Sequence, residues 1–163
     1  MSYSEKDMQL NELFEQLSTA ERASVTQEIE TKIWALWLES GDDIINQMME
    51  EATTLMLDSQ YSKAIELFSR VIEQMPDFVE AWNKRATAYF LRGDYKKSMD
   101  DAKVTLSLEP RHFGALSGLA SIYLTVGDNH AALRAFERIL DIKPKQSTIQ
   151  AQVKRLKTKV NTH

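Results

Sequence analysis

Residues 76–95 read PDFVEAWNKRATAYFLRGDY, and residues 109–120 read EPRHFGALSGLA. Each stretch starts at or beside a proline, and a third proline follows at the same interval, so that Pro76, Pro110 and Pro144 are each 34 residues apart. The chain has only these three prolines. A fixed interval of this length is typical of a repeated supersecondary unit. The sequence therefore predicts three copies of one unit.

Other residue types recur at the same interval and indicate what the unit is. Small residues recur at Ala52, Ala86 and Ala120 and at Ala64, Ser98 and Ala132, while larger ones recur at Leu55, Tyr89 and Tyr123. Small side chains let two antiparallel helices approach closely. Gly93 and Gly127 stand where the turn between two helices requires a left-handed backbone conformation. Because proline lacks an amide hydrogen, it ends the second helix. Each unit is therefore predicted to be a helix-turn-helix hairpin.

This pattern resembles the tetratricopeptide repeat (TPR). The middle copy carries most of the signature residues: Trp82, Ala86, Tyr89, Gly93, Tyr95 and Pro110. The stretch from Pro76 to Leu119 also resembles a narrower group of bacterial TPR proteins. The resemblance implies an all-α fold, a right-handed α-α superhelix (TPR solenoid) of three helix-turn-helix repeats. We expect a single domain over residues 1–163, with repeats at 45–76, 79–110 and 113–144.

Helices are also expected at both ends, because an isolated repeat cannot bury its outer apolar face and a solenoid needs caps. Apolar residues at helical spacing predict a helical hairpin within residues 1–41 and one capping helix over residues 147–160. Trp34 and Trp37 are expected to pack the N-terminal hairpin onto repeat one.

The composition excludes several classes of function. The chain of 163 residues has no cysteine, so disulfides, thiolate zinc sites and cysteine nucleophiles are absent. Its three histidines do not stand at metal-ligand spacing, and no nucleophile or phosphate-binding motif occurs. We therefore expect no enzyme activity, no cofactor and no metal. Without a signal-peptide pattern or an apolar run of about 18 residues, a cytoplasmic location is favoured, and a periplasmic one stays open if a signal peptide has been removed.

The resemblance implies that the first helix of each repeat lines a concave groove that holds a peptide segment of another protein. The groove positions are Asn46, Met49, Thr53, Met56, Glu80, Asn83, Thr87, Phe90, Gly114, Ser117, Ser121 and Leu124. The expected apolar anchors are Met49, Met56, Phe90 and Leu124, and soft Met side chains adapt to varied partners. Positive charge is expected at the groove mouth from Lys84, Arg111 and His112.

The clamp by which some TPR proteins hold chaperone C-terminal carboxylates needs Lys, Asn and Arg at particular groove positions. Those positions here read Met49, Thr53, Gly114 and Gly118, so this ligand is not expected.

Glu51 and Arg85 occupy equivalent positions in neighbouring repeats. On adjacent helices they predict an ion pair that fixes the stacking of the repeats.

The net charge of −4 conceals a gradient along the chain. Residues 1–51 carry twelve Asp and Glu against three Lys and Arg, a net −9, whereas residues 143–163 carry six Lys and Arg and no acid, a net +6. The acidic total argues against nucleic acid as a partner. The favoured function is a protein-binding adaptor or chaperone-like scaffold. The alternatives are self-assembly through the two oppositely charged ends, and a secretion chaperone, a class that this chain resembles in size, repeat number and acidity.

Overall fold

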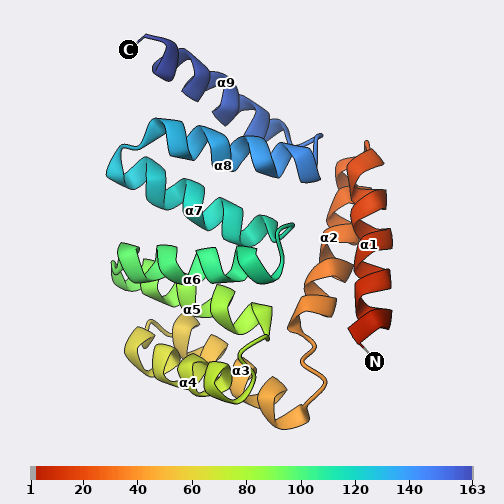
Figure 1. The fold of residues 1–163 in the computed structure, drawn as a ribbon, viewed down its shortest axis with the longest axis vertical. Helices are drawn as coiled ribbons and strands as arrows, with labels where there is room; N and C mark the ends of the chain where they lie inside the picture. The colour runs from red at the N-terminus through yellow and green to blue at the C-terminus, as the bar shows by residue number, and fades with distance from the viewer. Residues whose placement is uncertain (1–2, 163) are drawn as a thin grey trace.

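A computed structural model describes residues 3–162, and helices are the only regular secondary structure in that range (Figure 1). The helices are α1 (Tyr3–Thr19), α2 (Ala23–Leu38), α3 (Asp43–Leu57), α4 (Tyr61–Gln74), α5 (Val79–Arg92), α6 (Tyr95–Leu108), α7 (Phe113–Val126), α8 (Asn129–Ile142) and α9 (Ser147–Asn161). From α3 to α9 each helix packs against the next one in the chain. The predicted all-α solenoid is confirmed. Within the described range, no helix is both long enough and apolar enough to cross a membrane.

The turns inside the three repeats share one conformation. Gly93 and Gly127 have φ values of 90° and 79°, as the sequence predicted, and Ser59 takes φ 61° at the equivalent place in repeat one. In each repeat the residue that follows this left-handed one donates its backbone N–H to a Leu or Tyr carbonyl in the preceding helix. Asp94, for example, donates to the Tyr89 carbonyl at 2.9 Å. Repeat one therefore keeps the turn without glycine, at the cost of a strained serine.

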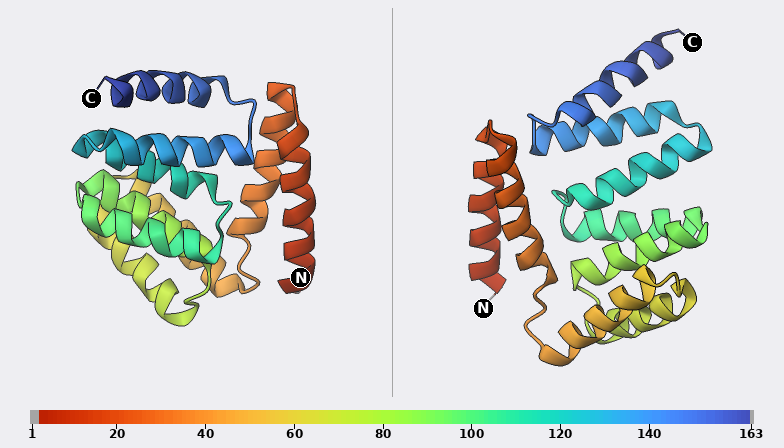
Figure 2. Two further views of the ribbon diagram at one scale, coloured as in Figure 1. Left: turned by 45° about the horizontal axis from the view of Figure 1, so that its top comes forward. Right: turned by 180° about the vertical axis from the view of Figure 1, so that it is seen from behind.

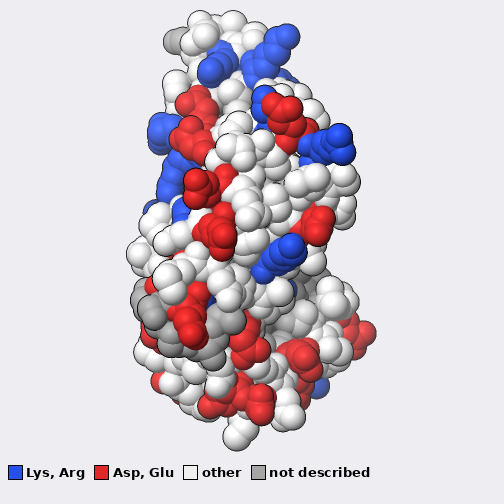
Figure 3. Space-filling view, turned by 90° about the vertical axis from the view of Figure 1, so that its right-hand side faces the viewer, with Lys and Arg blue, Asp and Glu red and all other residues white. Residues whose placement is uncertain are grey.

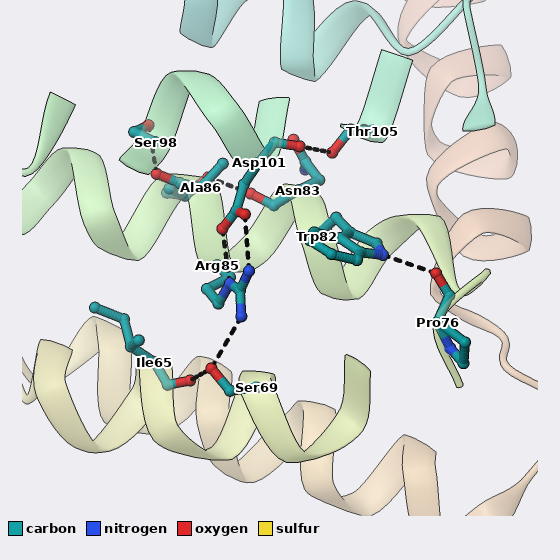
Figure 4. Close-up of polar contacts among 11 residues, drawn as sticks. Ile65, Ser69, Pro76, Trp82, Asn83, Arg85, Ala86, Ser98, Asp101 and Thr105 are labelled. Atoms are coloured by element: carbon teal, nitrogen blue, oxygen red, sulfur yellow. Dashed lines mark hydrogen bonds and ion pairs between the residues drawn. The ribbon is translucent and has the colours of Figure 1, made fainter. Parts of the chain in front are cut away.

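A largely buried ion pair inside repeat two also reaches repeat one (Figure 4). Arg85 of α5 donates from Nε and Nη2 to the two carboxylate oxygens of Asp101 in α6, at 2.7 and 2.8 Å. Its Nη1 donates to the Ser69 hydroxyl of α4 at 3.1 Å. The bonds to Asp101 raise the pKa of Arg85 above its ordinary value. One guanidinium thus holds three helices in register.

The ion pair predicted between Glu51 and Arg85 is therefore wrong. Glu51 is exposed on α3, and Arg85 turns instead toward Asp101 on its own repeat. A buried guanidinium needs a carboxylate that is buried with it, and Asp101 meets that need.

The N-terminal hairpin runs across the ends of the repeats instead of stacking beneath repeat one (Figures 1 and 2). The Trp37 ring stacks on His112 with centroids 4.1 Å apart and an interplanar angle of 11°. Trp34 meets the Phe113 ring edge to face at 5.6 Å. The expectation that these tryptophans pack on repeat one is wrong, since their partners open repeat three.

His112 is the buried centre of this contact. The Ala115 backbone N–H donates to His112 Nδ1 at 3.0 Å, which leaves the ring hydrogen on Nε2. Nε2 then donates to the Glu80 carboxylate, also at 3.0 Å. Both side chains are fully buried. The neutral imidazole therefore connects the starts of α5 and α7 while its face receives Trp37.

Polar contacts at the rim hold the hairpin in the same place. Arg111 donates to Asn11 of α1 at 2.7 Å and lies over the Phe14 ring at 4.4 Å. Lys143, just after α8, pairs with Glu30 of α2. The hairpin is thus attached to the loops before α7 and α9.

For Asp101→Ala we expect the free energy of unfolding to fall by about 3–5 kcal/mol, because the buried Arg85 charge loses its partner. For a chain of this size that corresponds to a melting temperature lower by roughly 6 to 20 °C. Thermal denaturation followed by circular dichroism measures it. The matched control is Asp100→Ala, whose exposed pair with Lys96 is worth less than about 1 kcal/mol. Equal melting temperatures for the two variants would contradict the assignment.

For Trp37→Ala we expect a loss of about 3–5 kcal/mol, as for other buried tryptophans. The loss should be local, because the ring holds the hairpin to one site on the repeats. Hydrogen exchange should therefore speed up in α1 and α2 while α5 to α8 stay protected. Leu38→Ala, next along α2 and 41% exposed, is the control. A uniform loss of protection over the whole chain would rule out a separable hairpin.

Candidate peptide-binding groove

The first helices of the repeats, α3, α5 and α7, lie next to one another. Along this wall the structure opens a cavity of about 120 Å³ between repeats two and three. Its lining consists mostly of small and apolar residues: Asn83, Ala86, Thr87, Phe90, Ser98, Ala102, Gly114, Ala115, Gly118 and Ser121. The residues come from α5, α6 and α7, so the cavity exists only because two repeats stack.

Two glycines of α7 define the cavity. A Cβ atom built on Gly118 would meet no atom within 4 Å, so the space beside it is empty. A Cβ on Gly114, one turn earlier, would lie 2.7 Å from the Trp34 ring. The N-terminal hairpin therefore packs against the start of α7, while the space beside Gly118 stays open.

Polar groups stand at the rim of the cavity. Asn83 is 92% buried, and its Nδ2 donates to Glu80 at 2.9 Å. The Thr87 hydroxyl donates to the Asn83 carbonyl at 3.1 Å, and Ser121 is exposed. These bonds leave Asn83 Oδ1 and the two hydroxyl oxygens as acceptors for a peptide N–H.

Five predicted groove residues come together at this cavity. They are Asn83, Thr87, Phe90, Gly114 and Ser121. Phe90 is half-buried, and its ring lies 5.4 Å from that of Tyr95. The candidate site is thus the part of the predicted groove formed by repeats two and three.

The structure does not bring the residues of repeat one into this site. Met49 and Met56 are 3% and 6% exposed and pack in the core of repeat one, so their prediction as apolar anchors is wrong. Asn46 accepts a hydrogen bond from the Ser40 backbone and so fixes the link to the hairpin. Thr53 donates to the Met49 carbonyl. No repeat precedes α3, and the N-terminal hairpin does not stack on it. The Met49 and Met56 side chains therefore pack inward against α4.

The remaining predicted residues lie around the site. Glu80 is fully buried against His112, so neither residue can present charge to a ligand, and the prediction of His112 as a positive group at the groove mouth is wrong. Arg111 is engaged by Glu109 and Asn11. Ser117 is exposed outside the cavity, whereas Leu124 is half-buried against the core of repeat three and Lys84 is half-buried on α5.

The sequence reasoning missed the small residues that form the floor of the cavity. Ala86 and Ser98 were expected to let helices pack closely, Gly118 was noted only as a position without a clamp residue, and Ala102 and Ala115 were given no role. The sequence feature that could have indicated the cavity is the run of small residues at facing positions. Such side chains are too small to fill the space between the helices at the density of a protein interior. Only the observed helix separation shows that the space is empty.

A second cleft, of about 570 Å³, separates the hairpin from repeats one and two. Lys6 and Glu39 lie on its hairpin side. Burial lowers the pKa of Lys6, whose Nζ donates to the Glu39 carbonyl at 2.7 Å. Hydrogen bonds from Asn46 and the Gly41 N–H lower the pKa of Glu39.

Over residues 3–162 no group of three His, Asp or Glu side chains could hold a metal ion.

Known proteins match the chain in both sequence and structure. Family models described as tetratricopeptide repeat match residues 49–106 and 114–146. A TPR repeat-containing protein of Rhizobium etli is 39% identical over 151 residues, which are 93% of this chain and 74% of that protein. A heat-shock protein cognate co-chaperone of Aspergillus fumigatus is 27% identical over 93 residues, which are 57% of this chain but only 27% of that protein.

Solved structures show the same fold at lower identity. The Sgt2 TPR domain from Aspergillus fumigatus superimposes with a TM-score of 0.65 and 22% identity, over 74% of this chain and 81% of that one. The first TPR of Spaghetti (RPAP3), solved with the HSP90 peptide SRMEEVD, gives 0.66 and 16%, over 72% and 93%. The repeat models cover more than half of the sequence and the Rhizobium protein matches nearly all of it, so the chain belongs to the tetratricopeptide-repeat family.

Proposed function

We propose that this chain is a non-catalytic adaptor that holds a segment of another protein against α5 and α7. One apolar side chain of that segment enters the cavity beside Gly118. The open cavity between repeats two and three is the observation that carries the proposal. The family and its fold are those of protein-interaction modules, which supports a binding role rather than catalysis.

The size and lining of the cavity suit a single aliphatic side chain. An engineered cavity of about 150 Å³ holds one benzene molecule, and this one measures about 120 Å³. Asn83 Oδ1 and the Ser121 hydroxyl lie beside the opening, where they bond the segment's backbone.

The chemistry of this surface favours an apolar segment over an acidic one. The peptide in the RPAP3 structure, SRMEEVD, is acidic. In this chain the wall beside the cavity offers glycine and hydroxyl residues, and Arg111 and His112 are occupied by internal partners. The fold is therefore used for a different class of ligand.

Gly118→Leu should fill the cavity and weaken peptide binding by about 10- to 100-fold, because the segment loses the burial of one side chain, worth about 1.5–3 kcal/mol. Folding should survive, since the new Cβ meets no neighbour and leucine favours a helix more than glycine does. The measurement is calorimetric titration with peptides selected from a random displayed library against the parent protein.

Ser107→Leu adds the same side chain on the exposed part of α6, away from the cavity, and should bind as the parent does. The proposal fails if no peptide is selected, or if Gly118→Leu binds the selected peptides as tightly as Ser107→Leu.

Self-association is a second candidate function, supported by the position of the charge gradient in space. The basic residues after position 143 belong to the α9 end of the solenoid, and the acidic first third of the sequence includes α3 at the opposite end. Figure 3 shows one side of the molecule, with Lys and Arg more frequent toward the top, where α9 lies, and Asp and Glu more frequent toward the bottom.

A further inference from the structure

The outward side of α3 has no cap. Because the N-terminal hairpin crosses the ends of the repeats, one face of α3 is left in solvent. This α3 face carries four acids and two aliphatic residues, all exposed: Asp43, Ile44, Glu50, Glu51, Leu57 and Asp58. Ile44 is 68% and Leu57 79% exposed. Ile44 and Leu57 lie at the two ends of α3, so each offers a separate aliphatic contact beside the acids.

The opposite end of the solenoid carries the complementary charge. Val153 and Leu156 bury one side of α9 against α8, and its basic residues point to solvent. This α9 face consists of Lys154, Arg155, Lys157 and Lys159, and no acid occurs after position 142. The methylene stems of lysine and arginine can cover aliphatic surface while their charges pair with carboxylates.

We propose that the α3 face of one copy binds the α9 face of a second copy, head to tail. The inference rests on the self-association proposed above and names its two surfaces. Contacts between two α3 faces would oppose acids to acids, and contacts between two α9 faces would oppose bases to bases, so charge selects the unlike pair. A contact between unlike surfaces repeats from copy to copy and yields a ring or an open chain. The groove wall of α5 and α7 is outside both surfaces.

Charge reversal on each face provides the test, with the full chain in sedimentation equilibrium at low and high salt. One variant carries Glu50→Lys and Glu51→Lys, and the other carries Lys154→Glu and Arg155→Glu. The parent should associate at low salt and dissociate near about 1 M, where the screening length falls to about 3 Å. Each variant alone should associate at least tenfold more weakly. An equimolar mixture of the two should associate again, because each unlike pair of faces is then restored.

The matched control carries Glu12→Lys and Glu15→Lys, which change two exposed acids of α1 and shift the net charge as the α3 variant does. It should associate as the parent does. Circular dichroism confirms that all variants fold. A parent that stays monomeric at low salt overturns both self-association and this contact. A parent that associates while the α3 variant behaves like the α1 control overturns only the α3–α9 contact and leaves association through another surface.

Discussion

Close approach of helices at small residues is the constraint on which the rest of the structure depends. Ala52, Ala86 and Ala120, one in each repeat, are at most 6% exposed, and Ser98 donates to the Ala86 carbonyl across the hairpin at 2.7 Å. Such contacts fix the distance between helices, and the 34-residue interval repeats that distance along the chain. Where glycine and alanine replace larger residues on three neighbouring helices, the same distance leaves a cavity. The stacking geometry and the candidate binding site therefore have one origin.

Buried polar groups then determine how the repeats and the N-terminal hairpin are attached to one another. Arg85 pairs with Asp101 inside repeat two and donates to Ser69 of repeat one, and Glu80 and His112 fix the start of α5 to that of α7. A buried polar group must be hydrogen-bonded where it lies, so each pair allows one relative position of its helices. The second pair also presents the imidazole face that Trp37 covers. The hairpin consequently packs against the start of α7 and leaves the outward side of α3 uncovered.

The repeats could be predicted from sequence because their signals are local. Proline spacing, small residues and the glycine turns act over one or two helices, and Ser59 shows that the turn persists without glycine. The position of the hairpin could not be predicted, because its apolar stripe fits any apolar partner. Contacts distant in sequence, to His112, Phe113 and Lys143, select its place. Met49 and Met56 were misplaced for a related reason. A position that faces the groove in other family members faces it here only where neighbouring helices extend the groove wall. No helix precedes α3 in the stack of repeats.

We propose that a guest side chain occupies the space between repeats two and three. The most direct measurement is a solution NMR study of the protein bound to a selected peptide, with labelled methyl groups at Ala86, Ala102 and Ala115. These methyls line the cavity, so nuclear Overhauser contacts to one aliphatic side chain of the peptide are expected at all three. Contacts confined to the hairpin, or to α3 and α9, with the three methyl signals unmoved, would contradict the account.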